Sequence, residues 1–236
     1  MAKRGKIYKT NLAKVDRTKR YSLDEALSIV ETFQARKFDE SIEVAINLGV
    51  DPKQSDQMVR GASVLPHGIG KTIRVAAIVR GDAEKEAREA GADFVGSDDL
   101  IEKIEKGWLD FDRLLATPDT LKDLTKVAKV LGPRGMMPNK KTGTVTTEIG
   151  KAVREQKLGK VEYKVEKSGI VHTLFGRKSF GKDKLKDNFL TLFENILKAK
   201  PATSKGVYIR KVTIAPTMGP GLVLDSQAVE IEARKA

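Results

Sequence analysis

The sequence predicts an α/β protein of two domains, one split between the two chain ends and the other inserted into it. Between residues 68 and 158, short apolar runs alternate with short helical segments, as in a unit built on a parallel sheet. Before and after this stretch, longer segments alternate apolar and polar residues, which predicts half-buried strands of a second sheet. We therefore expect residues 1–67 and 159–236 to form one domain and residues 68–158 to form the other.

The split domain is expected to combine one helix and one strand from the N-terminal part with several later elements. Ser22 and Glu25 have the spacing of a capping box, and apolar residues then recur at helical period, which predicts a helix over 22–36. Residues 41–50 alternate strictly and predict a strand. Further strands are expected at 161–165, 170–175 and 207–214, with a helix at 183–199. The strand at 41–50 is their expected partner.

The inserted segment alternates strands with helices. Strands are expected at 73–79, 94–95 and 114–116, helices at 83–90, 99–106, 119–130 and 147–157, and a long loop at 131–139. Insertion requires two close crossings between the domains. Because a double connection of this kind permits rotation, His67, Gly68 and Gly159 are the expected hinge.

The chain is basic, and its positive charge is concentrated in the split domain. Of 236 residues, 44 are Lys or Arg and 32 are Asp or Glu, which gives a formal net charge of +12. Residues 68–158 hold 17 basic and 15 acidic side chains, so the split domain holds 27 and 17. This excess favours a polyanionic partner, and nucleic acid is the usual one.

Residue content also limits the class of protein. Without cysteine the chain cannot form disulfides, thiolate nucleophiles or cysteine-bound metal sites. No apolar stretch approaches the length of a membrane-spanning helix, so no membrane partner is expected. The first twenty residues hold eight basic side chains and one acidic one with no apolar core, which predicts a basic arm rather than a signal peptide. The cytosol is the expected compartment, and no cofactor or metal is expected.

The segment GIGKT at 68–72 resembles the end of a phosphate-binding loop. That motif needs an earlier glycine where this chain has Leu65, and it must be followed by a helix. A strand is expected here instead. A flexible connection between the domains is the simpler interpretation.

The loop LGPRGMMPNKK at 131–141 packs two glycines, two prolines and three basic residues into one stretch. One interpretation is an ordinary mobile loop. The other is a second, weaker RNA or tRNA contact, in which Arg134, Lys140 and Lys141 bind phosphates.

Two segments of the split domain offer groups that suit RNA. Lys37, Phe38 and Ser41 place a cation, a ring and a hydroxyl just before a strand, although Phe38 could equally cap the core. In APTMGPG at 215–221, prolines stiffen the loop and glycines leave room for a partner, while Thr217 and Met218 could contact ribose or base. A plain turn between strands would explain this second segment as well.

A third segment, YKVEKSG at 163–169, predicts a glycine turn whose tip displays Lys167 and Ser168. A solvated basic turn is the alternative. His172 lies on the following strand, where a lone histidine is more often structural than catalytic.

Taken together, these segments resemble the bacterial large-subunit ribosomal protein L-one family. The likeness covers nearly the whole chain in order and lies in KFDESIEV (37–44), LPHGIGKTIRV (65–75), AGADFVGSDDLIEKI (90–104), GWLDFD (107–112), ATPD (116–119), LGPRGMMPN (131–139), KTGTV (141–145) and TMGP (217–220). The resemblance implies a split α/β sandwich domain that binds RNA and an inserted, Rossmann-like three-layer α/β domain.

The resemblance also implies partners and contacts. It implies a structural protein of the large ribosomal subunit, monomeric when free, that binds the stalk helices of 23S rRNA near the exit site. It further implies help in releasing deacylated tRNA there and repression of translation through the messenger of its own operon. The family's rRNA contacts correspond by position to Lys37, Phe38, Ser41, Lys167, Ser168, Thr217, Met218 and Gly219.

The chain departs from the family pattern at three places. Ser41 stands where threonine is usual, Val165-Glu166 where Asn-Asp is usual, and Lys140 where proline is usual. Ser41 keeps the hydroxyl, but Val165 loses a polar side chain, which makes contacts from the 163–169 turn less secure than those from the Thr217 loop.

Two other function classes remain open from the residues. A nucleotide-dependent enzyme could be built on the inserted domain, but the chain has two histidines, His67 and His172, and no nucleophile elbow or metal-ligand spacing. The pair Asp110 and Asp112 is more simply a turn before a strand. The other class is a messenger-binding repressor with no ribosomal role.

The charge distribution predicts a strong salt dependence of RNA binding. We expect the logarithm of the affinity to fall linearly with the logarithm of salt concentration, by about 0.7 to 0.9 for each phosphate neutralised, because each contact releases a counterion. Filter binding over a salt series measures the slope. A flat profile would contradict the charge argument.

Overall fold

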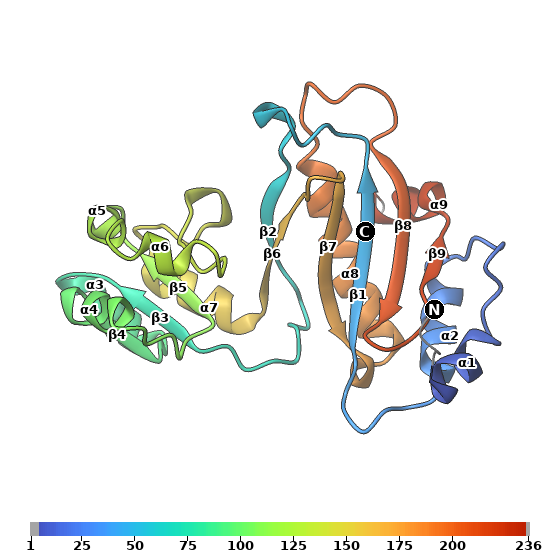
Figure 1. Ribbon diagram of the computed structural model, residues 1–236, viewed down its shortest axis with the longest axis horizontal. Coiled ribbons are helices and arrows are strands. Elements are labelled where there is room, and N and C mark those ends of the chain that lie inside the picture. The colour runs from blue at the N-terminus through green and yellow to red at the C-terminus, as the bar shows by residue number, and fades with distance from the viewer. Residues whose placement is uncertain (1–4, 235–236) are drawn as a thin grey trace. The chain divides into compact units, whose positions relative to one another are not determined.

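The computed structural model describes residues 5–234, which form two compact units (Figure 1). Unit 1 contains the described residues up to Gly70 together with those from Val161 onward, and unit 2 is Lys71–Lys160. Helices accompany an antiparallel sheet in unit 1 and a parallel sheet in unit 2, so the predicted α/β class is confirmed. The crossings fall a few residues after the boundaries that we expect from the sequence.

Unit 1 is built on a four-stranded antiparallel sheet in the order β7-β1-β8-β9. Its strands are β1 (Ser41–Leu48), β7 (Ile170–Arg177), β8 (Ile209–Pro216) and β9 (Leu222–Leu224). β1 pairs with β7 on one side and β8 on the other, which confirms the expected pairing of the strand at 41–50 with later strands. The first third of the chain thus joins the last third in one sheet.

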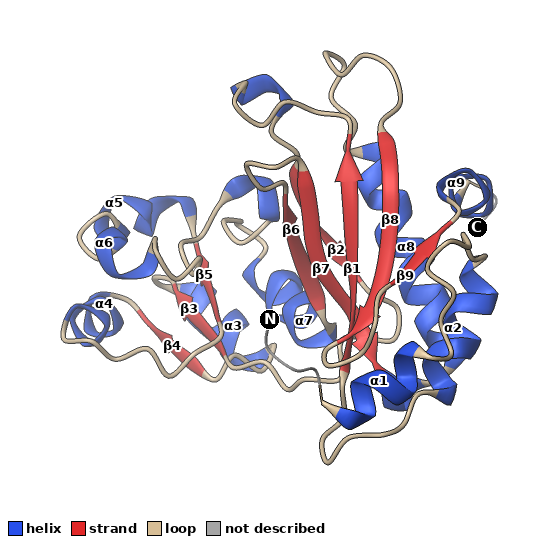
Figure 2. Ribbon diagram, turned by 45° about the vertical axis from the view of Figure 1, so that its right-hand side comes forward, coloured by secondary structure: helices blue, strands red, loops and turns tan. Residues whose placement is uncertain are grey.

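Helices cover one face of this sheet. The helices α2 (Leu23–Thr32), α8 (Lys182–Lys198) and α9 (Ser226–Ala233) pack on its strands. Ile42, Val44 and Ile46 of β1 point into the core beneath them and are at most 1% exposed. The opposite face of the central strands is turned towards the viewer in Figure 2, with α8 behind the strands.

One predicted strand joins a different sheet. β6 (Lys160–Lys164) pairs with β2 (Arg60–Val64) in a two-stranded sheet, and just after its end Val165 forms an isolated bridge with Val171 of β7. The expectation that this segment pairs with β1 is therefore wrong. β2 has no clear alternation of apolar residues, because Gly61 and Ser63 occupy its buried positions, and for that reason the sequence did not reveal it.

Unit 2 has three layers. Its parallel sheet has the order β4-β3-β5, with β3 (Val75–Ile78), β4 (Phe94–Gly96) and β5 (Arg113–Ala116). All four residues of β3 are buried, as expected for a parallel strand covered on both faces. The helices α3 (Asp82–Glu89), α4 (Asp98–Glu105), α5 (Leu121–Leu124), α6 (Ala128–Leu131) and α7 (Ile149–Leu158) complete the unit.

Two helices differ from their predicted extent: one is interrupted and the other ends earlier. The single helix expected at 119–130 is interrupted, because backbone bonds span only three residues between α5 and α6 and the Thr125 hydroxyl donates to the Lys122 carbonyl. The helix expected to reach residue 36 ends at Thr32, where Phe33 turns to extended backbone. Its capping box at Ser22 and Glu25 is confirmed.

The predicted basic arm is folded over the part that the structure describes. Residues Lys6–Leu12 form the helix α1, and the buried Asn11 accepts a hydrogen bond from the Gln34 amide at 2.9 Å. The rest of the arm, residues 1–4, lies outside the described residues. Within 5–234, no helix combines the length and apolar character that crossing a membrane requires.

Two buried tyrosines close the C-terminal end of α8. Tyr163 donates its hydroxyl to the Asn195 carbonyl and Tyr208 donates to the Ile196 carbonyl, each at 3.1 Å. These carbonyls belong to the last turn of the helix, where backbone acceptors run short of partners within the helix. The Asn195 carbonyl also accepts from the Ala199 amide at 3.1 Å. Burial raises the pKa of both phenols above the usual 10.0.

The raised pKa values predict a loss of stability in alkali. Above pH 10 the unfolded chain releases protons that the folded chain still holds, so the free energy of unfolding falls as the pH rises. Urea unfolding at a series of pH values measures this. The double variant Tyr163→Phe, Tyr208→Phe should show a shallower decline, and an equally steep decline in both chains would contradict the assignment.

Candidate nucleic-acid interface

Six of the eight residues that the family resemblance suggests as rRNA contacts lie at one end of the unit 1 sheet. Ser41 opens β1, and Pro216 at the end of β8 stands opposite Ile42. The loop before β1 and the loop after β8 therefore meet, at the lower end of unit 1 in Figure 1. We call this the Phe38 end; it contains Lys37, Phe38, Ser41, Thr217, Met218 and Gly219.

Hydrogen bonds fasten the two loops of the Phe38 end to each other. The Thr217 hydroxyl accepts from the Ser41 amide and donates to the Ser41 carbonyl, both at 3.2 Å. The Thr217 amide also donates to that carbonyl at 3.0 Å. One residue further, the Met218 amide donates to the carboxylate of Glu40 at 3.0 Å. Thr217 thus has an internal structural role, and the loop is held in place before any partner arrives.

Glu40 was not singled out in the sequence. Its side chain is 3% exposed, which is unusual for a carboxylate, and its charged oxygen accepts from a backbone amide. An acidic residue inside a basic binding segment gives no signal of this role, because only the fold brings residue 218 beside it.

The Phe38 end exposes two large apolar side chains. Phe38 is 54% exposed and Met218 is 51% exposed. The alternative in which Phe38 caps the core is therefore wrong. Arg36 donates to the Met218 carbonyl at 3.4 Å, and Lys37 is exposed. This end combines cations for phosphate with apolar groups that can pack against ribose or base.

Gly219 is required by packing within the chain. A Cβ at this position would lie 2.3 Å from Cγ of Pro216, closer than real Cβ atoms come to their neighbours. At Gly221 the nearest atom is a side-chain methyl of Thr213 at 3.1 Å, which can move more easily. The glycine at 219 therefore lets the loop fold back onto the end of β8.

The other two suggested contacts, Lys167 and Ser168, lie at the opposite end of the sheet. In the β1–β7 pairing Ile170 stands opposite Asn47, six residues along β1 from Ser41. At about 3.4 Å per residue, about 20 Å of sheet separates the two groups. Both side chains are exposed on a turn that ends at Gly169, whose φ is +78°. The suggested contacts therefore form two groups rather than one.

The open face of the sheet connects these two groups. Its middle row consists of Ala45 on β1, flanked by His172 on β7 and Thr213 on β8. Exposed Glu43 and Lys211 carry opposite charges on this face, and the apolar Ile170 and Leu174 of β7 are half-buried beside β1. His172 is exposed to solvent on this face and stands opposite Ala45 of β1.

The loop at 131–141 in unit 2 ends in a compact turn. It is the candidate for a second RNA contact. The Asn139 side chain accepts from the Lys141 amide at 2.8 Å, and the hydroxyls of Thr142 and Thr144 bond to the Asn139 carbonyl. Lys140 and Lys141 open a 3-10 turn and are exposed. Arg134 is exposed as well.

The first crossing between the units is tied to unit 1 by a buried side-chain amide that no sequence motif indicates. Asn188 of α8 is 0% exposed, and its carbonyl oxygen accepts from the His67 amide at 3.0 Å. Its amino group donates to the Gly68 carbonyl at 2.9 Å. Arg177 holds the Gly70 carbonyl in the same way at 3.0 Å. At the second crossing, Gly159 ends α7 with a φ of +104°.

Several acidic groups of unit 2 form ion pairs with neighbouring cations. Arg80 follows β3 and bridges Asp98 at 3.0 Å and Asp123 at 3.2 Å, beside the strand ends where α/β sheets usually hold a nucleotide. A phosphate there would meet two carboxylates. Lys71 donates to Asp112 at 2.7 Å and lowers the pKa of that carboxyl to about 2. Asp112 precedes β5 directly, as the sequence predicts.

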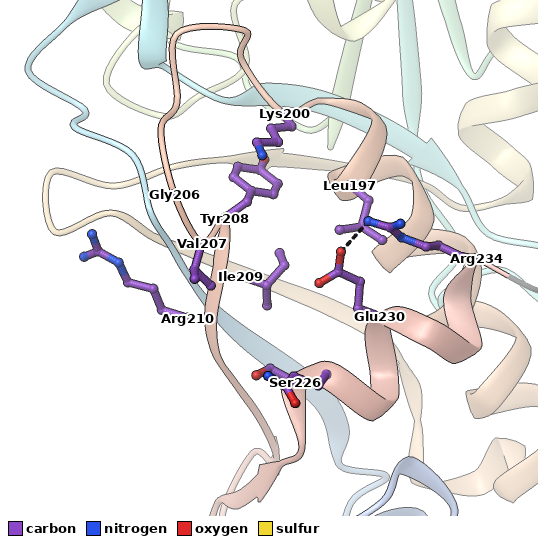
Figure 3. Close-up of a pocket in the computed structure, with 11 residues that line it drawn as sticks. Leu197, Lys200, Gly206, Val207, Tyr208, Ile209, Arg210, Ser226, Glu230 and Arg234 are labelled. Carbon is purple, nitrogen blue, oxygen red and sulfur yellow. Dashed lines mark hydrogen bonds and ion pairs between the residues drawn. The ribbon is translucent and has the colours of Figure 1, made fainter.

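Unit 1 also contains a hollow of about 530 Å³ between the start of β8, the end of α8 and α9 (Figure 3). Three of its charged groups have partners: Glu230 pairs with Arg234 at 2.6 Å, and the Lys200 ammonium lies over the Tyr208 ring at 5.9 Å. Across residues 5–234, no cluster of potential metal ligands was found.

The tight packing at Gly219 predicts the effect of adding one methyl group. Gly219→Ala should lower the free energy of unfolding by about 1–3 kcal/mol, because the loop must move away from Pro216. Gly221→Ala is the matched control and should cost less. Urea unfolding of both variants measures the difference, and equal stability of the two would contradict the packing argument.

Comparison with known proteins agrees with this architecture. The profile of the family described as "Ribosomal protein L1p/L10e family" matches residues 30–220. The chain is 55% identical over 229 residues to the large ribosomal subunit protein uL1 of Solidesulfovibrio magneticus, which covers 97% of each chain. It is also 55% identical over 224 residues to the protein of the same name from Bdellovibrio bacteriovorus, covering 95% of this chain and 96% of that one. The chain therefore belongs to the ribosomal protein L1p/L10e family.

Proposed function

We propose that the chain is a structural protein of the large ribosomal subunit and binds 23S rRNA at the stalk near the exit site through unit 1. Membership of a ribosomal protein family supports the structural role and argues against an enzyme. As a ribosomal protein the chain works in the ribosome, in the cytoplasm. The net charge of +12 supports a polyanionic partner.

The observation that carries the rRNA proposal is the fixed, exposed Phe38 end. Its backbone is held by Thr217 and Glu40, so binding does not have to order the loops first. Phe38 and Met218 remain exposed, which costs stability in water unless a partner covers them. Neighbouring cations would bind phosphates and hold the RNA in register.

Three finer roles rest on the family resemblance. One is repression of translation through the messenger of the chain's own operon, which requires an RNA structure similar to the stalk. A second is help in the release of deacylated tRNA, with unit 2 turning about the two crossings and Arg134, Lys140 and Lys141 as a secondary contact. The third is a monomeric state of the free chain. Fractionation of ribosome profiles would separate a ribosomal component from a repressor that binds only messenger.

We predict that Met218→Asp weakens binding to the 23S stalk fragment more than any single change in unit 2. The new carboxylate would face RNA phosphates and remove an apolar contact, so a loss of at least tenfold is expected, about 1.4 kcal/mol or more. Thr217→Val should weaken binding too, because it removes the two bonds of the hydroxyl to Ser41 and leaves only the backbone bond. Filter binding measures both, with Lys140→Asp as the unit 2 control. Equal affinities of all three variants would refute the proposal.

A further inference from the structure

A hollow of about 640 Å³ opens at the end of unit 1 opposite the Phe38 end. It lies between the loop that precedes β2 and the turn that links β6 to β7, near the top of unit 1 in Figure 1. The volume falls within the range of sites that enclose small organic ligands. Lys167 and Ser168 form part of its rim.

We propose that this hollow accepts a single unpaired nucleotide of the bound RNA, with its base against Met58 and its phosphate at Lys164 and Lys167. This inference rests on the proposed rRNA binding and adds a site to it. RNA recognition often uses bases that leave the helical stack and enter a protein surface.

The floor of the hollow suits a flat apolar ring. Met58 is 40% exposed, and its flexible thioether side chain can adapt to a ring placed on it. Pro52 and the buried Val165 continue the apolar surface. An exposed methionine beside a proline is costly in water, and covering both with a base removes that cost.

The rim suits the polar parts of a nucleotide. Lys164 and Lys167 are exposed and, among the described residues, neither forms an ion pair. Glu166 is an acceptor for the amino group of a base, and Ser168 can bond to a ribose hydroxyl. One apolar floor with two cations and one acceptor matches a nucleotide better than a free anion, which would use only the cations.

Hydrogen bonds within the chain hold both walls of the hollow in place before a ligand binds. In the first wall the Asp51 amide donates to the Gln57 side chain at 2.9 Å, and the Gln57 amide group donates to the Gln54 side chain at 2.7 Å. In the second, the Glu166 amide donates to the Ile170 carbonyl at 2.9 Å. The Val165 amide joins the walls by donating to the Val59 carbonyl at 2.9 Å. A ligand would therefore meet a shaped site.

The test uses the full chain, the 23S stalk fragment and chemical probing of each ribose 2′-hydroxyl. In the wild-type complex, an unpaired nucleotide should be protected from the reagent that modifies its 2′-hydroxyl. In the complexes of Met58→Glu and of Met58→Ser, the same nucleotide should react again. The affinity should fall roughly tenfold with Met58→Glu, the lower part of the range for losing a base contact. Ile231→Glu, at another exposed apolar residue on α9, is the matched control and should bind like wild type.

The outcomes separate this inference from the proposed function. If both Met58 variants keep the wild-type protection pattern, the hollow does not hold RNA and the inference is overturned, even where the charge of Met58→Glu alone lowers affinity. In that case weak binding by Met218→Asp would leave the proposed function intact. If Met218→Asp also binds like wild type, the proposed function fails. Thermal unfolding should show all variants folded, since Met58 and Ile231 are exposed.

Discussion

The pairing of β1 with β8 is the constraint on which the candidate interface depends. It brings together loops that are 176 residues apart in the chain, and the bonds between Thr217 and Ser41 complete the junction. The long separation is possible because unit 2 is a compact insertion with its own core. Without this pairing, Phe38 and Met218 would belong to two unrelated loops.

The geometry of unit 1 suggests how affinity and specificity divide between charge and shape. Basic residues lie at both ends of the sheet, whereas on the open face between them the charges of exposed Glu43 and Lys211 offset each other. Cations at the two ends can bind phosphates regardless of sequence. Because the two ends are about 20 Å apart, only a folded RNA with matching features at that spacing can contact both ends.

Sequence reasoning predicted the regular parts well because they depend on local periodicity. The strand at 41–50, the capped helix at Ser22 and the amphipathic helix at 183–199 all have strong patterns, and each is present within a few residues. β2 and the break between α5 and α6 were missed, since they depend on tertiary contacts and on a threonine hydroxyl.

The candidate site was predicted in part for the same reason. The motifs of the sequence single out Phe38 and Met218 as candidate contacts without deciding whether Phe38 is exposed. Glu40 and Asn188 act through long-range bonds that no local pattern reveals. Likewise, nothing in the motifs indicates that Lys167 and Ser168 lie at the far end of the sheet. That separation follows only from the register of β1 with β7.

Hydrogen exchange of the full chain, with and without the 23S stalk fragment, tests the central claim most directly. The account predicts slower exchange of backbone amides at 37–41 and 217–221 in the complex, with smaller changes across unit 2. Slower exchange confined to unit 2, with the two loops of the Phe38 end unchanged, would contradict it.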